Sequence, residues 1–476
     1  MSVTAFHWAD YAVFALLLML STGIGVFFGC KDRKKVSTEE FLMAGRSMSI
    51  GPVAVSMFAT LMSSVAFLGD PVEVYYYGSS YLAMIIGGTL GMIPVAHIFA
   101  PKFHEMHFLS AFELLEKSYN HKVRKAASLT QVLSMMFMMG VVLYAPALAL
   151  SQASGISVTV GVIVTSIVCT FYTTFGGMKA VLWADTIQMV VMFAGLFALL
   201  ICSVIAVGGF GPIWEVASRG QRLDMFIRMT PNPFERSNFW TYLVGGFFKV
   251  LIPFASTQLC IQRYCTLKTP KDTTKVVYLN IPLFLVCIST FFLVGVIMYV
   301  YWSCDPVVSK QIDRVDQMIP LLVLQVLGFM PGVPGLFIAC LFSASLSTLS
   351  SGENALAANM LSDLVIPWYK RKYKKDMPDR TGTLIAKGLA VGVGVIVTGL
   401  SFIIMQMGSS MFVIANQVLG MLGGPICGLF IAALMFPRIN TTGITIGFFA
   451  SLSICVWWGM GAVACGPPKQ TLPLRL

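Results

Sequence analysis

Charged side chains are scarce in this chain. Asp, Glu, Lys and Arg make up 11% of its 476 residues and hydrophobic residues 57%, whereas a soluble globular protein carries about 25% charged residues. The 11 cysteines show no CxxC or Cys/His spacing, so the sequence offers no zinc framework. It also contains no P-loop, GxSxG or HExxH motif, which argues against an ATP-driven pump or a hydrolase. We therefore expect a polytopic membrane protein that is not an enzyme.

Long apolar runs recur along the whole chain, each of a length that can span about 30 Å of hydrocarbon. The first of them, within 8–29, follows a segment without Lys or Arg, so we expect a retained helix rather than a signal peptide. The sequence predicts about twelve transmembrane helices. They cover residues 8–29, 51–78, 80–101, 123–153, 156–175, 181–208, 237–260, 276–302, 332–362, 384–406, 411–436 and 441–464.

The distribution of Lys and Arg predicts the orientation of these spans. With the N-terminus outside, 23 of the 32 basic residues fall in cytoplasmic segments such as 31–46 and 8 fall outside, as the positive-inside rule requires. The basic cluster 370–375 is then a juxtamembrane anchor on anionic lipid rather than a nucleic-acid site. In this topology the sequon at Asn440 is cytoplasmic and unused. Cys304 and Cys465 both fall outside, where a disulfide is chemically possible.

Two of the apolar runs are interrupted by polar and helix-breaking residues. The run 51–78 contains Thr, Met, Ser and Ser, followed by Gly69, Asp70 and Pro71, and the run 237–260 contains a Gly pair, Lys249 and Pro253. Freed backbone carbonyls in such broken helices can line a transport site. The spacing of the two runs predicts a five-plus-five inverted repeat. Its parts are a leading helix 8–29, a first repeat 51–208, a second repeat 237–436 and a trailing helix 441–464.

The run 332–362 carries six hydroxyl side chains in the nine residues from Ser343 to Ser351. Such side chains can simply let membrane helices pack closely. They are also hard neutral oxygen ligands of the kind that a small cation prefers. We favour a sodium cage formed with the freed carbonyls of the run 51–78, because the two unusual stretches occur together.

A Gly pair, Gly176-Gly177, predicts a tight cytoplasmic turn between the runs 156–175 and 181–208. Asp185 follows about one and a half turns into the next helix. An acid at this depth is either part of a cation relay or the partner of a basic neighbour, and the residues alone leave both alternatives open.

Taken together, these stretches resemble the sodium/solute symporter family. The resemblance rests on residues 37–48, on the turn 175–180, and on 347–350 followed by Asn354-Ala355. The segment 68–75 is most similar to the branch of sodium-coupled monocarboxylate, multivitamin and iodide transporters. That branch normally has one more helix after 441–464, which we expect to be missing because the sequence ends at Leu476.

The resemblance implies the leucine-transporter-type fold and alternating access. It implies sodium as the coupling ion, held by the carbonyls of Ala59, Met62 and Ala344 and the hydroxyls of Ser347 and Thr348. Asp185 matches an acid linked to cation movement, and no cofactor is implied. The substrate-site candidates are Ser63, Ser64, Ala66, Asp70, Lys249 and Gln258.

Three charged residues depart from the pattern of the branch, namely Asp70, Lys249 and Glu353. Because a buried acid and base are far more stable together than apart, we hypothesise an Asp70–Lys249 ion pair beside the substrate site. Alternatively, Lys249 binds a substrate carboxylate directly and Asp70 tunes it, or one of the two reaches a water-filled vestibule. Glu353 has no partner that the sequence suggests.

The sequence as a whole predicts a sodium-coupled secondary active symporter in the plasma membrane with an extracellular N-terminus. Its expected partners are Na⁺, a small organic anion and the lipid bilayer, and no nucleic acid. A short monocarboxylate is the first candidate substrate, a vitamin carboxylate such as biotin or pantothenate the second and an inorganic anion the third. The alternative is a non-translocating sodium/solute sensor or a leak channel on the same fold.

Overall fold

The computed structural model describes residues 6–31, 37–226, 229–232, 235, 237–407, 410–465 and 471–472. Over these residues the chain forms helices and no β-strand, and one isolated parallel bridge joins Met48 to Leu267. Residues 32–36, part of the predicted cytoplasmic segment 31–46, lie outside the described residues. The predicted all-α fold class is confirmed.

The order of the elements follows the apolar runs of the sequence. The first half of the chain contains α1 (Trp8–Lys31), α2 (Thr38–Met43), η1 (Ala44–Arg46), α3 (Ile50–Leu61), α4 (Ser64–Tyr77), η2 (Gly78–Leu82), α5 (Ala83–Pro94), η3 (Val95–Phe99), α6 (Ala100–Met106), α7 (Glu113–Ser118), α8 (His121–Ser154), α9 (Val158–Ala206) and α10 (Phe210–Arg219). The second half contains α11 (Phe239–Ser256), α12 (Gln258–Thr266), α13 (Pro270–Tyr301), η4 (Val315–Gln317), α14 (Met318–Leu327), α15 (Val333–Met360), η5 (Leu361–Val365), α16 (Ile366–Tyr373), α17 (Asp379–Gln406), α18 (Met411–Val418), η6 (Leu419–Gly423), α19 (Gly424–Met435) and α20 (Thr441–Cys465).

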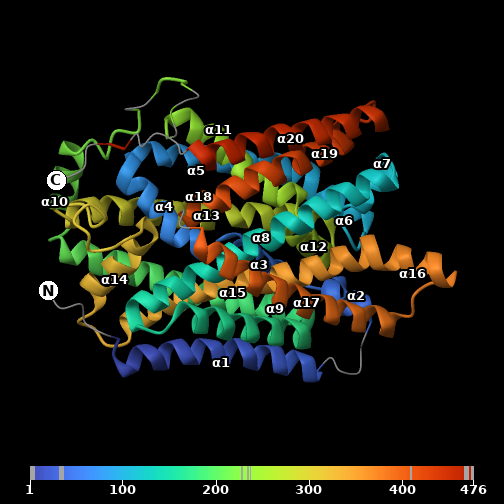
Figure 1. Cartoon of the computed structure of the whole chain (residues 1–476), viewed down its shortest axis with the longest axis horizontal. Helices are drawn as coiled ribbons and strands as arrows, with labels where there is room; N and C mark the ends of the chain where they lie inside the picture. Colours follow the sequence, from blue (N-terminus) through green and yellow to red (C-terminus); the bar gives the residue numbers. More distant parts are fainter. Residues whose placement is uncertain are drawn as a thin grey trace.

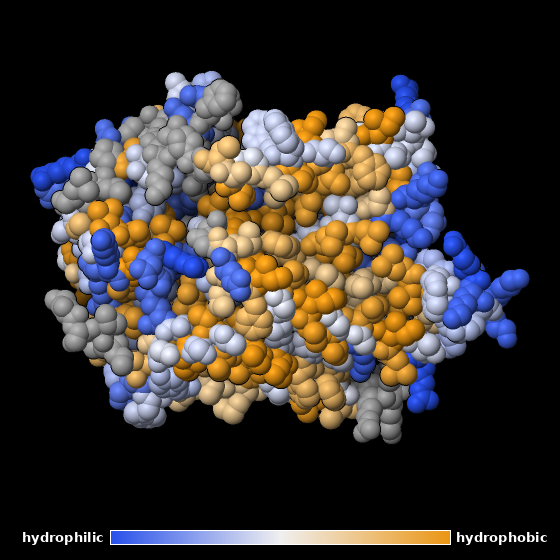
Figure 2. Space-filling model, in the orientation of Figure 1, coloured by the Kyte–Doolittle hydropathy of each residue, from blue (hydrophilic) through white to orange (hydrophobic). Residues whose placement is uncertain are grey.

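The long helices run roughly parallel to one axis of the molecule, as Figure 1 shows. Helices α10 and α14 lie at one end, where α1 also begins, and α2, α7 and α16 lie toward the other. Hydrophobic side chains cover the middle of the molecule and hydrophilic ones gather at the two ends (Figure 2). Ten helices of the described residues are long and apolar enough to cross a membrane. The chain is an integral membrane protein, and the count of twelve spans stays a prediction.

The predicted turn at Gly176-Gly177 is confirmed. Helix α9 extends from Val158 to Ala206, but Gly177 within it has the non-helical angles φ +60° and ψ −161°. Only glycine adopts this conformation readily. A side chain at this position would also collide with Phe41 of α2. The predicted spans 156–175 and 181–208 are therefore two helices that meet at a sharp bend within α9.

Both predicted interruptions are present, and the first lies within the stretch of Thr, Met, Ser and Ser in the run 51–78. Helix α3 ends at Leu61 and α4 begins at Ser64, so the break falls at Met62 and Ser63. Asp70 and Pro71 lie inside α4, where tertiary packing sustains a helix that local preference alone would weaken. The second break falls at Thr257, whose extended backbone (φ −100°, ψ 141°) separates α11 from α12.

Helix α15 forms the centre of the bundle. In its most apolar 18-residue stretch, 89% of the residues are buried. In the corresponding stretch of α20, at the periphery, 11% are buried. Its contacts extend to α9, α8, α1, α17 and α3. The hydroxyl-rich stretch 343–351 is therefore surrounded by protein and does not face lipid. Cys304 and Cys465 are both free thiols in this structure.

Candidate functional site

The break in the first interrupted helix lies against the hydroxyl-rich face of α15. Ser347 Oγ lies 2.8 Å from the carbonyl oxygen of Ala59 and 3.1 Å from that of Ala344. Thr348 Oγ1 lies 2.8 Å from the carbonyl oxygen of Thr60 and 3.1 Å from that of Ala344. Because α3 ends at Leu61, the carbonyls of its last turn lack the usual helical partners. Three carbonyls and two hydroxyls are thereby gathered, all of them on buried residues.

This oxygen cluster overlaps the set of ligands that the family resemblance implied, with one difference. The structure brings together Ala59, Ala344, Ser347 and Thr348, and it adds the carbonyl of Thr60. Met62 lies in the break itself (φ −87°, ψ 86°) and its N–H donates to the carbonyl of Phe58. Within the described residues no hydrogen bond joins Met62 to α15. Neutral oxygens in this arrangement suit Na⁺, and the role of each residue as a ligand stays a prediction.

A cavity of about 180 Å³ lies beside the two helix breaks. Ser63, Ala66, Asp70 and Lys249 line it, as expected for substrate-site candidates, together with Thr348 of the oxygen cluster. Most of the remaining lining is apolar, and the polar exceptions are Thr60, Gln131, Ser134, Thr257 and Asn416. A small molecule with one charged group and an apolar body fits such a surface.

Ser64 and Gln258 do not line this cavity, contrary to expectation. Ser64 accepts a hydrogen bond from Ser345 on α15 at 2.7 Å, so its hydroxyl packs two helices together. The side chain of Gln258 binds the loop between α6 and α7: its Oε1 accepts from the N–H of Ala111 at 2.9 Å and its Nε2 donates to the carbonyl of Leu109 at 2.7 Å. A residue next to a helix break can therefore point away from the cavity.

The predicted ion pair between Asp70 and Lys249 is present. Lys249 Nζ, on α11, lies 3.4 Å from Asp70 Oδ1 on α4 and 5.2 Å from the centre of the Phe412 ring. The carboxylate is 2% exposed, whereas the lysine side chain is 33% exposed. The base thus joins the two interrupted helices and still presents its charge to the cavity.

Asp185 is part of a second buried ion pair. Arg263 of α12 lies with Nη2 3.0 Å from Asp185 Oδ2, and the Ser56 hydroxyl donates to the same oxygen at 2.5 Å. The same Nη2 also donates to Thr60 Oγ1 and Ser351 Oγ, each at 2.5 Å. Of the two alternatives for Asp185, the basic neighbour is therefore observed. Thr60 connects this network to the oxygen cluster, since its carbonyl contacts Thr348.

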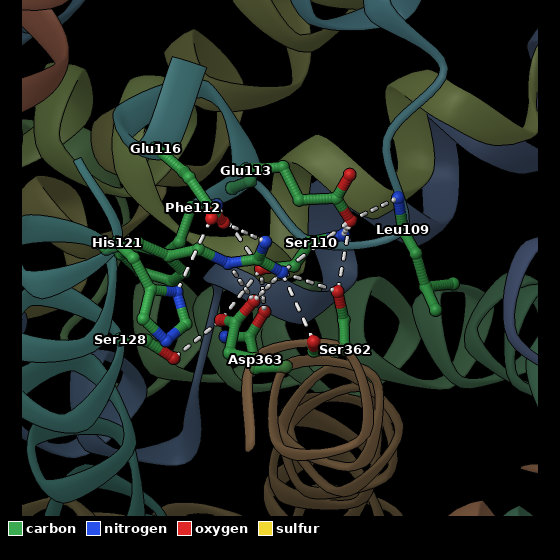
Figure 3. A network of polar contacts seen from close by, with 12 residues as sticks. Leu109, Ser110, Phe112, Glu113, Glu116, His121, Ser128, Ser362 and Asp363 are labelled. Carbon is green, nitrogen blue, oxygen red and sulfur yellow. Dashed lines mark hydrogen bonds and ion pairs between the residues drawn. The ribbon is translucent and has the colours of Figure 1, made fainter. Parts of the chain in front are cut away.

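A third polar network, which the sequence did not reveal, lies at the end of the molecule that carries α7. Arg124 of α8 binds Asp363 of η5 through Nε at 2.9 Å and Nη2 at 2.6 Å, and it binds Glu116 of α7 through Nη1 at 2.6 Å (Figure 3). The hydroxyls of Ser110 and Ser128 donate to the other carboxylate oxygen of Asp363. The guanidinium holds the pKa of Glu116 below its ordinary value.

This third network is joined to the second interrupted helix through a single loop. Ser110 of the loop binds Asp363, and Leu109 and Ala111 on either side of it bind Gln258. Gln258 is the first residue of α12, directly after the break at Thr257. The loop therefore connects α12, one half of the broken helix, to η5, which follows α15.

The sequence was compared with known families and proteins. A family model described as the sodium:solute symporter family matches residues 41–450. This chain belongs to that family. It is 39% identical to sodium-coupled monocarboxylate transporter 2 of Mus musculus over 100% of this chain and 76% of that protein. It is 38% identical to the sodium-dependent multivitamin transporter of Oryctolagus cuniculus over 97% of this chain and 71% of that protein.

Solved structures show the fold of this family member. A Na⁺-coupled sialic acid symporter in a substrate-bound outward-open state superposes with a TM-score of 0.81, at 22% identity, over 97% of this chain and 98% of that one. MhsT in complex with L-phenylalanine superposes with a TM-score of 0.55, at 14% identity, over 88% of this chain and 99% of that one. The leucine-transporter-type fold is thus confirmed.

Proposed function

We propose that this family member imports a small organic anion together with sodium by alternating access. The observation that carries the proposal is the oxygen cluster at the break of α3 and α4, placed beside a cavity into which Lys249 presents a positive charge. The oxygens supply the ligands for Na⁺, and the lysine supplies a partner for a carboxylate. Inward movement of one positive charge through 100 mV releases about 2.3 kcal/mol, which can drive accumulation of the solute.

The size of the cavity favours a short monocarboxylate as the substrate. Its volume of about 180 Å³ is below the range of roughly 300–1,000 Å³ in which drug-sized ligands bind. The printed names of the relatives include monocarboxylate and multivitamin transporters. A vitamin carboxylate is therefore the second candidate, and it requires the cavity to widen.

For the topology we propose an extracellular N-terminus in the plasma membrane. Lys and Arg concentrate in the segments that this orientation places in the cytoplasm. The network of Arg124 and Asp363 then lies on the cytoplasmic side. The proposed repeats are 51–208 and 237–436, flanked by the helices 8–29 and 441–464, because each repeat then begins with one of the two broken helices.

An uptake panel tests the proposed function. The protein is expressed in a host cell without the activity, and uptake of labelled pyruvate, lactate, nicotinate and biotin is measured with sodium and with choline in its place. We expect uptake of at least one of these anions in sodium and none in choline. Sodium current without solute uptake would show a leak channel, and solute binding without uptake would show a sensor.

Replacing Thr348 with valine or Ser347 with alanine is expected to raise the sodium concentration for half-maximal uptake by about fivefold. Loss of one oxygen ligand removes about 1 kcal/mol of favourable interaction, and 1.4 kcal/mol corresponds to a factor of ten in affinity. Ser343→Ala is the matched control, because Ser343 lies buried on the same helix and its hydroxyl has no hydrogen-bond partner. An equal change in all three variants would contradict the proposed ligand set.

Replacing Arg124 with glutamine is expected to destabilise the cytoplasmic network by about 2 kcal/mol, because hydrogen bonds to charged groups contribute about 1.5–3 kcal/mol. The purified variant should melt at a lower temperature than the wild type. Lys122→Gln is the control, since Lys122 lies two residues away with an exposed side chain. If both variants melt like the wild type, Arg124 does not stabilise this end of the bundle.

A further inference from the structure

Glu353 is a buried acid without a basic partner. It lies on α15 with 3% of its surface exposed, between α9 and α17. The Thr170 hydroxyl of α9 donates to its Oε1 at 2.8 Å, and its Oε2 is buried with no hydrogen-bond partner in the part of the chain that the structure describes. Among the described residues, Glu353 forms no ion pair with any Lys, Arg or His. It belongs neither to the oxygen cluster nor to the three networks described above.

The surroundings of Glu353 favour its neutral form. Cys169 of α9 is the titratable group that interacts electrostatically with the carboxyl, α17 presents Gly394, and neither brings a positive charge. Isolated carboxylates are strongly disfavoured in such an environment and take up a proton instead. A Cβ added to Gly394 would collide with the Thr170 hydroxyl and lie 3.1 Å from Glu353 Oε1. The packing is thus close, as suits a proton rather than a hydrated cation.

A single hydroxyl connects this carboxyl to the surface of the bundle. Thr170 lines a groove of about 460 Å³ between α9 and α17, whose lining is otherwise mostly apolar. Thr170 thus faces the groove and donates to Glu353 Oε1 at 2.8 Å, which gives a proton one hydroxyl step between the groove and the carboxyl.

We propose that Glu353 is a proton-binding site that makes this transporter sensitive to pH. In the arrangement described the carboxyl holds one proton on Oε2, and it exchanges that proton with solvent by way of Thr170. Loss of the proton leaves a negative charge between α9, α15 and α17, and this charge disfavours their close packing. Glu353 lies on the same helix as Ser347 and Thr348, about 8–9 Å along its axis, so its protonation affects the helix that contributes to the oxygen cluster. The effect on uptake rests on the proposed function, whereas the proton site does not.

The first test measures stability and needs no transport. Near neutral pH the folded protein holds a proton on Glu353. In the unfolded chain this glutamate, with a pKa of about 4.3, has already lost its proton. Stability should therefore fall as pH rises, by up to a tenfold shift of the folding equilibrium per pH unit for one proton. The melting of purified wild type and Glu353→Gln is compared from pH 5.5 to 8.5. We expect the stability of the variant relative to the wild type to grow with pH.

Two controls separate a proton from other causes. Glu105→Gln removes an exposed glutamate and should keep the pH dependence of the wild type. The same series in choline should give the same result as in sodium. An unchanged slope in Glu353→Gln would overturn the proposal, and so would a difference that depends on sodium but not on pH, because that would show a cation site.

The second test measures uptake against pH. Glu353→Gln should transport at a rate that depends less on pH than that of the wild type. If this variant cannot be purified, Thr170→Val takes its place: without the donor to Oε1 the anion is less stable, so the fall in uptake should move to higher pH. An unmoved curve overturns the proposal. If no tested anion is transported, the proposed function fails, and the melting series still decides the proton site.

Discussion

Replacing Arg263 with methionine is expected to prevent accumulation of folded protein at the cell surface. The guanidinium is 1% exposed and lies beside the fully buried carboxylate of Asp185. Removal of one partner of a buried ion pair leaves an uncompensated charge and costs about 3–5 kcal/mol. This is a large fraction of the roughly 5–15 kcal/mol by which a folded domain is stable. Surface labelling and thermal melting of the purified protein measure the loss.

The double variant Asp185→Asn with Arg263→Gln tests whether the charge is the cause. It removes both charges and retains groups that can form hydrogen bonds with Ser56, Thr60 and Ser351. We expect it to be more stable than either single variant. Arg371→Met, on the exposed part of α16, should have no effect. A single variant as stable as the wild type would show that the pair does not hold α9 and α12 together.

Asp70→Asn and Lys249→Met are each expected to lower uptake by 50-fold or more, that is, by about 2.3 kcal/mol or more of the activation free energy. Each variant leaves one charge without its partner at the junction of α4 and α11. The double variant, which removes both charges, should recover a substantial part of the uptake if the pair is needed to hold the two helices. Initial rates corrected for the amount of protein at the surface provide the measurement.

The same series distinguishes an ion pair from direct binding of substrate. If Lys249 binds the substrate carboxylate, the double variant stays as inactive as Lys249→Met, and that outcome would contradict a purely structural pair. Lys249→Arg is the informative control, because it keeps the charge and changes the geometry. Under direct binding it should raise the substrate concentration for half-maximal uptake more than it lowers the maximal rate.

The sequence was sufficient to predict the membrane class, both helix interruptions and the pair of Asp70 with Lys249. The first break falls within the polar stretch of Thr, Met, Ser and Ser in the run 51–78, whereas Gly69 and Pro71 lie inside α4, because tertiary packing overrides their local preference against a helix. Beside this break, α15 supplies two hydroxyl groups to the backbone of α3. Those contacts join residues 288 positions apart, and no local pattern encodes them.

The networks of Arg263 and Arg124 could not have been assigned from the sequence for a related reason. Asp185 suggested a basic partner, but Arg263 is 78 residues away and resembles any arginine in a cytoplasmic segment. Arg124 is likewise one of the basic residues that indicate a cytoplasmic segment, and its partner Asp363 is 239 residues distant in the sequence. The orientation of Gln258 likewise depends on a loop whose path is fixed only in the folded state.

Thr60 has a consequence for how sodium affinity and the Asp185–Arg263 pair influence each other. Its side-chain hydroxyl belongs to the ion-pair network and its backbone carbonyl belongs to the oxygen cluster, so one residue takes part in both. Any coupling free energy between two such sites is reciprocal. If disruption of the pair weakens sodium binding by a given factor, bound sodium must strengthen the pair by the same factor. Saturating sodium should therefore protect the interface of α9 and α12 from unfolding, and the two sites behave as one thermodynamic unit.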